Sequence, residues 1–380
     1  GSAALQAFQN QDSIDIFILF PSGKVSPIQE RQMTSLAGVG AHAICVAGDF
    51  DTCQDIVKAC FNDHKFRDTV NLSAINSINW ARLVPQIVYY FTSAVELGAP
   101  DQKVAFSVPT GNFGNIFAGW AAKQMGLPID RLIVASNRND ILPRFFENGK
   151  MVREKVHQSL SPSMDIQVSS NFERLLFELL ERDAELCALK MKDFASTGLF
   201  DVSLAQLKVA KEIFAAYRVN DAQTTQRIKF LYDHFGMIFD PHSAVGLEAA
   251  KAARDDEVVS KNIPIISLAC AHPAKFPDAV ENAIGVRPEL PQHLFDLMDR
   301  KESKIDVDGN EAKVVQSLSN IIEKHKPKIL IEINKILLTQ QELDYLISFF
   351  KQNNYKILSG KKLKNLNSIY THYKQWGMDL

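Results

Sequence analysis

The stretch Ser107-Val-Pro-Thr-Gly-Asn-Phe-Gly-Asn-Ile-Phe-Ala-Gly119 is an apolar run that stops at a turn with two glycines and restarts as a helix. Gly111 and Gly114 permit left-handed backbone dihedrals, so the turn is expected to point successive N–H groups inward. The helix expected from Ile116 adds the positive end of its dipole. The stretch therefore predicts an anion site, and its G-x-x-G spacing differs from the Walker and Rossmann patterns.

The rest of the chain alternates between short β-branched or aromatic runs and longer amphipathic ones. Strands are predicted at Ile14–Phe20, His42–Val46, Val104–Val108, Leu132–Ala135 and Ile263–Ala269. Helices are predicted at Ile28–Leu36, Leu83–Leu97, Ile116–Met125, Phe172–Cys187 and Ala205–Tyr217. A further helix is predicted to begin at Asp51, which would be its N-cap. This alternation predicts an α/β fold with parallel sheets, and the last strand is expected to be buried and to deliver Cys270 to a ligand-binding edge.

Composition narrows the class of protein. The chain has 380 residues, 46% of them hydrophobic and 23% charged, which is ordinary for a globular protein. A net charge of −2 argues against a nucleic-acid-binding surface. The five cysteines are scattered without C-x-x-C pairs, so neither a disulfide framework nor a metal site is expected. No apolar stretch is long enough to span a membrane and no signal-peptide pattern is found, so a cytoplasmic location is expected.

Several motifs resemble those of threonine synthase, in that family's order and over about residues 1–300. They are Ser26-Pro-Ile-Gln-Glu-Arg-Gln-Met33, Asn76-Ser-Ile-Asn-Trp-Ala-Arg82, Val108-Pro-Thr-Gly-Asn-Phe-Gly-Asn115, Asp240-Pro-His-Ser-Ala-Val-Gly246 and Ala271-His-Pro-Ala-Lys-Phe276. The resemblance implies a pyridoxal 5'-phosphate enzyme of fold type II, tryptophan-synthase-β-like, with parallel sheets flanked by helices. Residues 1–100 would be the remainder of the small N-terminal domain, and residues 101–300 the large cofactor-binding domain.

The resemblance also implies the reaction and the site. Threonine synthase is a lyase of threonine biosynthesis that converts O-phosphohomoserine and water to threonine and phosphate. The cofactor phosphate would be held by Gly111, Asn112, Phe113, Gly114 and Asn115. The substrate phosphate would be held by Asn76, Ser77 and Arg82. Cys270 stands where the family usually has a threonine that hydrogen-bonds the pyridine nitrogen. The roles of His242 and His272 stay open between structural histidine and proton carrier, with the structural role favoured.

The lysine that forms the Schiff base in that family precedes the point where this sequence begins, so no catalytic residue is assigned here. The expectation is a threonine-synthase-like lyase whose activity in this chain alone is impaired. Two alternatives stay open. One is a non-catalytic protein that binds pyridoxal phosphate or another phosphate ligand, and the other is a chimeric gene product.

The last part of the sequence has a different resemblance. Lys304-Ile-Asp-Val-Asp-Gly-Asn-Glu-Ala-Lys-Val-Val315 and His325-Lys-Pro-Lys-Ile-Leu-Ile-Glu-Ile-Asn334 are similar to the C-terminal part of an FkbM-type methyltransferase. Residues 304–380 are therefore expected to be an α/β C-terminal extension. That family's S-adenosylmethionine-binding glycine motif does not occur here, so no methyl transfer is expected. The residues after about Lys304 are expected to be dispensable for the site.

Overall fold

A computed structural model describes residues 2–11, 13–48, 50–76, 79–307, 357–359 and 362–364. The chain divides into two compact units, Gly1–Pro327 and Lys328–Leu380. Within the second unit, the described residues form two short antiparallel strands, β10 (Ile357–Ser359) and β11 (Lys362–Lys364). The remainder of the predicted extension from residue 308 onward lies outside the described residues, and the predicted three-domain division stays a prediction.

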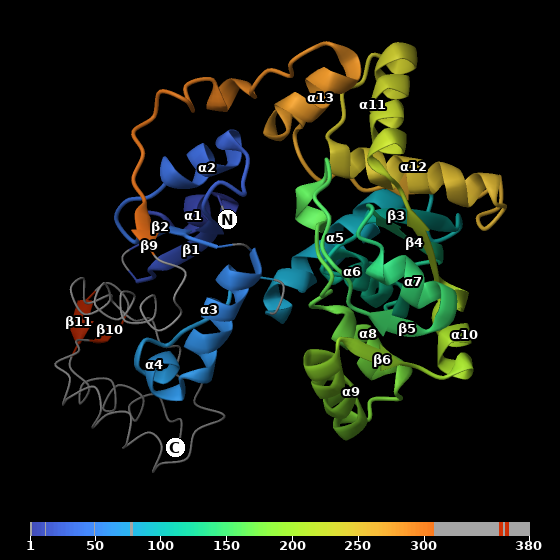
Figure 1. The fold of residues 1–380 in the computed structure, drawn as a ribbon, viewed down its shortest axis with the longest axis horizontal. Coiled ribbons are helices and arrows are strands. Elements are labelled where there is room, and N and C mark those ends of the chain that lie inside the picture. Colours follow the sequence, from blue (N-terminus) through green and yellow to red (C-terminus); the bar gives the residue numbers. More distant parts are fainter. Residues whose placement is uncertain are drawn as a thin grey trace. The chain divides into compact units, whose positions relative to one another are not determined.

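A small parallel sheet opens the first unit, with its strands in the order β1-β2-β9 (Figure 1). Its strands are β1 (Ile16–Pro21), β2 (Ala41–Val46) and β9 (Ile305–Val307). The helices of this part are α1 (Ser2–Phe8), α2 (Pro27–Thr34), α3 (Phe50–Asn62) and α4 (His64–Thr69). Alternate residues of β2 enter two different apolar clusters, with Ala43 and Cys45 in one and Ile44 and Val46 in the other. Burial on both faces explains why β2 is apolar apart from His42, which is only half-buried and pairs with Asp15.

The second sheet has four parallel strands in the order β7-β4-β3-β8. Its strands are β3 (Val104–Pro109), β4 (Ile129–Ser136), β7 (Phe214–Arg218) and β8 (Ile265–Ser267). All six residues of β3 are buried, and Phe106 and Ala105 face opposite clusters. The carboxyl end of this central strand is therefore held firmly where residues 110–115 begin, which are called the phosphate loop after their predicted role.

Helices and short strands surround this sheet (Figure 1). The helices are α5 (Trp80–Glu96), α6 (Gly114–Gln124), α7 (Ile141–Asn148), α8 (Phe172–Leu179), α9 (Ala184–Thr197), α10 (Leu204–Ile213), α11 (Asp221–Phe235), α12 (Pro241–Asp255) and α13 (Pro277–Ile284). Strands β5 (Lys150–Val152) and β6 (Leu199–Asp201) pair antiparallel. Single 3₁₀ turns lie at η1 (Pro162–Met164), η2 (Pro273–Lys275) and η3 (Gln292–Leu294). None of the helices described has the length and apolar character needed to cross a bilayer.

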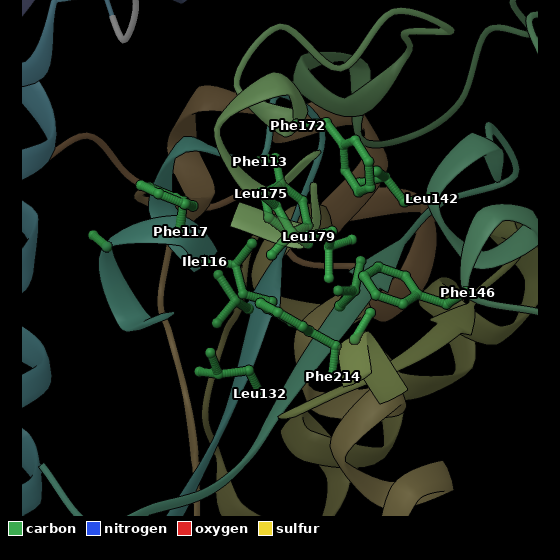
Figure 2. Packing of buried hydrophobic residues seen from close by; sticks show 14 of the residues in the cluster. Phe113, Ile116, Phe117, Leu132, Leu142, Phe146, Phe172, Leu175, Leu179 and Phe214 are labelled. Atoms are coloured by element: carbon green, nitrogen blue, oxygen red, sulfur yellow. The ribbon is translucent and has the colours of Figure 1, made fainter. Parts of the chain in front are cut away.

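An aromatic cluster fills the largest core and touches the phosphate loop (Figure 2). The ring of Phe113 packs edge-on against the ring of Phe172, with 5.1 Å between the ring centroids, and its centroid lies 5.6 Å from that of Phe214. Phe146 lies 5.5 Å from Phe214. Aromatic pairs of this kind add about 0.5–1.5 kcal/mol beyond the area they bury. The loop residue Phe113 is thus anchored in the core rather than in solvent.

Two predicted helices and one predicted cap are wrong. The run Phe172–Cys187 breaks into α8 and α9, because Glu181 and Arg182 take left-handed dihedrals and Asp183 caps the second helix by accepting from the N–H of Leu186. The apolar spacing continues across this break, so the periodicity of the sequence does not predict it. At the start of α3, the predicted cap Asp51 lies inside the helix, which begins at Phe50.

The run Ala205–Tyr217 is also not one helix. Helix α10 ends at Ile213, and the residues that follow form strand β7, which pairs with β4 from Phe214 opposite Leu132 to Arg218 opposite Ser136. Pairing with a buried strand outweighs local helix preference there. The predicted strand Ile263–Ala269 is confirmed as β8 but is half-buried rather than buried.

The beginning of the predicted extension is part of the first sheet. Strand β9 pairs in parallel with β2, with Ile305 opposite Ile44. The carboxylate of Glu302 accepts a hydrogen bond from the hydroxyl of buried Thr34 at 2.6 Å and lies 3.0 Å from the guanidinium of Arg31. The predicted boundary at residue 304 therefore falls inside an anchored segment rather than in a linker.

Candidate functional site

The phosphate loop follows β3 and leads directly into α6. Phe113, at φ 63°, is the left-handed residue that caps this helix, and its side chain makes no capping hydrogen bond. The prediction that Gly111 and Gly114 take the left-handed dihedrals is wrong, because neither has a positive φ. Anchoring of the Phe113 ring in the aromatic core holds this uncommon conformation.

Gly111 is required for space instead. A Cβ placed on it would lie 3.2 Å from Cα of Met164 and 3.2 Å from the carbonyl oxygen of Ser163. The carbonyl of Gly111 accepts from the hydroxyl of Ser169 at 2.7 Å, and that of Asn112 accepts from the N–H of Asn171 at 3.0 Å. The loop is therefore held from outside by the segment that precedes α8.

The N–H groups of this loop are left available. Among the described residues, none of the backbone amides of residues 112–116 donates to a protein acceptor. The side-chain oxygen of Asn112 is buried and has no hydrogen-bond partner there. Unpaired donors at a buried helix start are costly unless a ligand or water satisfies them. A phosphate group, which accepts several hydrogen bonds and carries negative charge, is able to pair with the N–H donors, whereas the Asn112 oxygen is itself an acceptor and needs a donor instead.

Asn115 is fixed by helix α5. The hydroxyl of Tyr90, which has no exposed surface, donates to the side-chain oxygen of Asn115 at 2.8 Å and also approaches its carbonyl oxygen at 3.0 Å. Tyr90 can come this close to α6 because residue 119 is a glycine, whose Cβ would lie 2.6 Å from the ring. Tyr90, which lies 25 residues earlier in the chain, thus fixes the position of Asn115 at the end of the loop.

Cys270 follows β8, and its thiol interacts electrostatically with Tyr89 and Tyr90 of α5. Although Cys270 is exposed, desolvation by the protein atoms around its thiol and the charge of Asp240 raise the pKa of the thiol to about 12. Burial and the neighbouring Cys270 raise the pKa of Tyr89 to about 12, against a hydrogen bond with Asn115 that lowers it. The structure therefore brings Cys270 and the phosphate loop together, and it keeps the thiol neutral at physiological pH.

The structure does not bring the residues predicted to bind the substrate phosphate into contact with the phosphate loop within the described residues. Asn76 and Arg82 are exposed, and Ser77 lies outside the described residues. Arg82 lies in the first turn of α5, eight residues before Tyr90, which is about 12 Å along the helix. No hydrogen bond joins Arg82 to the phosphate loop within the described residues, so its role stays a prediction.

The two histidines have different surroundings. His242 is buried, its Nδ1 lies 3.0 Å from Asp240, and its Nε2 accepts from the N–H of Ser163 at 3.2 Å. His272 caps η2 by accepting from the N–H of Ala274 at 3.2 Å. Both rings therefore make hydrogen bonds that hold the local backbone, which supports the structural role for each.

Sequence reasoning missed the residues that support the loop from a distance. Tyr90, Ser163 and Ser169 carry no motif signal of their own, because their contacts arise only on folding. Asp240 and Ser243 lie in a motif that was recognised, yet the spacing alone does not reveal that both reach toward Cys270. The recognised motif was the only signal that could have pointed to them.

Family models match three parts of the chain. The model described as pyridoxal-phosphate dependent enzyme matches residues 11–192, and the one described as threonine synthase, C-terminal, matches residues 243–318. A third, the methyltransferase FkbM domain, matches residues 303–357 and confirms the resemblance of the tail. The sheets, the phosphate loop and these matches together define a pyridoxal-phosphate-dependent enzyme of fold type II.

Comparison with individual proteins narrows this class. Threonine synthase from Pseudomonas aeruginosa is 47% identical over 328 residues, which are 86% of this chain and 69% of the relative. Threonine synthase from Saccharomyces cerevisiae is 40% identical over 356 residues, covering 87% and 68%. The crystal structure of threonine synthase with bound pyridoxal phosphate from Brucella melitensis has a TM-score of 0.77 at 50% identity, covering 84% of this chain and 68% of that one. The chain belongs to the threonine synthase family.

Proposed function

We propose that this chain is a pyridoxal-phosphate-dependent threonine synthase that acts on O-phosphohomoserine and water and yields threonine and inorganic phosphate. Family membership supports the reaction. We also propose that it works in the cytoplasm and that it does not bind nucleic acid. The balanced charge of the sequence, −2 overall, supports the second of these proposals.

The unpaired amides of the phosphate loop are the observation that carries the proposal. Five consecutive N–H groups, at residues 112–116, have no acceptor among the described residues, and they surround the start of a largely buried helix. Such a helix start is stable only if something accepts from these donors. The missing side chain at residue 111 lets the Ser163–Met164 backbone pack beside the loop and support it from outside.

The remaining residues have complementary roles in this proposal. Gly111 to Asn115 would hold the cofactor phosphate, with the Asn112 amide as a further contact. Cys270 would lie beside the pyridine nitrogen, and its raised pKa of about 12 means that it presents a neutral S–H group there. Asn76, Ser77 and Arg82 would bind the substrate phosphate, the guanidinium through paired donors. Pyridoxal phosphate, when bound, supplies the electron sink that stabilises charge on the substrate carbons.

Cofactor binding is tested by titrating the purified chain with pyridoxal phosphate in a calorimeter. Gly111→Val should weaken binding about tenfold or more, because its side chain meets the backbone of residues 163 and 164 and displaces the loop. Gly38→Ala is the matched control, since a Cβ there has nothing within 4 Å. Equal affinity in the Gly111 variant and the parent would refute the assignment of the loop.

Substrate binding needs a second measurement. Adding O-phosphohomoserine to the chain with bound pyridoxal phosphate should change the cofactor's visible absorbance, whereas homoserine, which lacks the phosphate, should have a much weaker effect. Arg82→Ala should abolish this difference between the two compounds. If the parent responds equally to both, the proposed phosphate selectivity is wrong, and a chain that only binds the cofactor becomes the better description.

A further inference from the structure

Asp240 is a carboxylate with no exposed surface at the N-cap of α12. One of its oxygens, Oδ1, accepts from the backbone N–H of His242 at 2.9 Å and from the ring Nδ1 at 3.0 Å. The other, Oδ2, accepts from the hydroxyl of Ser243 and from its N–H at 3.4 Å. Each oxygen thus orients one side chain, and the two side chains reach different segments of the site.

The His242 arm reaches the wall of the phosphate loop. Its Nε2 accepts from the N–H of Ser163 at 3.2 Å, so the ring proton resides on Nδ1, where Asp240 accepts it. Ser163 and Met164 are the residues that a Cβ on Gly111 would meet, at 3.2 Å each. The position of this backbone decides how much room the loop has.

The Ser243 arm reaches the segment that carries Cys270. The hydroxyl donates to Asp240 and accepts from the N–H of Cys270 at 2.9 Å. Ser243 thus joins the Asp240 carboxylate to the backbone of Cys270 through two hydrogen bonds. One carboxylate is therefore connected to both the loop that holds the phosphate and the residue placed beside the cofactor ring.

We propose that Asp240 is a positioning residue of the cofactor site, which holds the Ser163–Met164 wall and the Cys270 segment at a fixed separation through His242 and Ser243. This inference rests on the proposed function. Asp240 touches no ligand in it. Its effect on the cofactor is transmitted by the two hydrogen-bonded arms.

The ionised carboxylate is needed because it only accepts hydrogen bonds. With both arms donating to it, the imidazole Nε2 and the Ser243 oxygen remain as acceptors for the two backbone N–H groups. An asparagine would present an NH₂ group to one arm, so one side chain would have to turn or lose its partner. Asparagine is as good an N-cap as aspartate, so the helix start itself is preserved.

The variant Asp240→Asn tests this with two readouts. Pyridoxal phosphate affinity, measured by calorimetry, should fall about tenfold, the factor expected for one buried hydrogen bond left unmade. The absorbance maximum of the bound cofactor should shift as well. Without cofactor, alkylation of Cys270 by iodoacetamide, mapped by mass spectrometry, should accelerate at least about fivefold because its segment loosens. Asp183→Asn is the matched control, since the Asp183 carboxylate caps α9 but within the described residues accepts only from the N–H of Leu186.

The outcomes separate this inference from the proposed function. If the parent chain does not bind pyridoxal phosphate, the proposed function fails. If the parent binds it and Asp240→Asn binds it as tightly as Asp183→Asn does, only the role of Asp240 is overturned, whatever the alkylation rate. Should Asp240→Asn fail to fold, Ser243→Ala removes one arm alone. It is expected to accelerate Cys270 alkylation and to shift the cofactor absorbance, and unchanged values would overturn the proposal.

Discussion

Replacing Gly119 with alanine tests how closely α5 and α6 approach each other. The added Cβ would lie 2.6 Å from Cε1 and 2.8 Å from Cζ of Tyr90, and 3.0 Å from Cδ2 of Leu132. Since ordinary Cβ contacts begin at 3.4 Å, the ring has to retreat by 3.4 − 2.6 = 0.8 Å. Tyr90 has no exposed surface into which it can move, and its hydroxyl holds Asn115 of the phosphate loop.

The expected cost has two parts. Overpacking a close-packed core costs about 1–3 kcal/mol, and a weakened hydrogen bond adds about 1 kcal/mol, so unfolding should require about 2–4 kcal/mol less. Tyr90→Phe separates the two parts, because it keeps the ring and removes only the hydroxyl. It should cost about 1–2 kcal/mol.

Urea denaturation followed by circular dichroism measures these differences in the free energy of unfolding. Gly38→Ala serves as the control, because its Cβ has nothing within 4 Å and its φ is not left-handed. Its free energy of unfolding should stay within about 0.5 kcal/mol of the parent. If Gly119→Ala is equally harmless, the two helices do not pack as closely as described and Tyr90 cannot be what fixes Asn115.

Three further predictions concern other parts of the chain. Because the pKa of Cys270 is raised to about 12, only about one thiol in 10⁴ is ionised at pH 8. The rate of Cys270 alkylation should therefore increase about tenfold per pH unit up to pH 11. A rate that stops increasing near pH 9 would show that the pKa of this thiol is not raised. Burial favours protonation of Asp240, but the hydrogen bonds from its neighbours outweigh it and lower its pKa, so its stabilising effect is present above about pH 4 and lost as the pH falls below that value. Urea titrations at pH 3 to 6 should show a smaller acid loss in Asp240→Asn, and an equal loss would contradict the lowered pKa. Glu302→Ala removes the carboxylate that accepts from the Thr34 hydroxyl at 2.6 Å and pairs with Arg31. Thr34 keeps the carbonyl of Glu30 at 3.1 Å and Arg31 keeps that of Arg300, so the substitution should cost only about 1 kcal/mol in urea denaturation. No change would mean that Glu302 does not anchor the segment before β9.

Much of the fold follows from local patterns. The strands β1 to β4 were predicted to within three residues at each end, because burial on both faces makes such strands predominantly apolar. The failures lie where the apolar spacing does not change at a structural boundary. The break at Glu181 and Arg182 and the change from α10 to β7 at Phe214 are of this kind, since both depend on what the rest of the chain packs against them.

The loop of residues 111–115 was located through its motif, but the structural role of its glycines was predicted wrongly, and its binding of the cofactor stays a prediction. Gly111 was expected to provide a left-handed turn, whereas it provides room beside Met164, and Phe113 takes the left-handed dihedral because its ring is held in the core. Space between two segments is a property of their packing. It cannot be read from the residues of one segment.

Residue order and composition were sufficient to indicate the α/β class, the family and the place of the phosphate loop, because these depend on spacing within about ten residues. The supporting contacts were not accessible in this way. Tyr90 meets Asn115 across 25 residues, and Ser163 meets His242 across 79. Hydrogen bonds over such separations form only after the sheet has brought the segments together, so the geometry that leaves the N–H groups of the loop unpaired is a product of the folded chain.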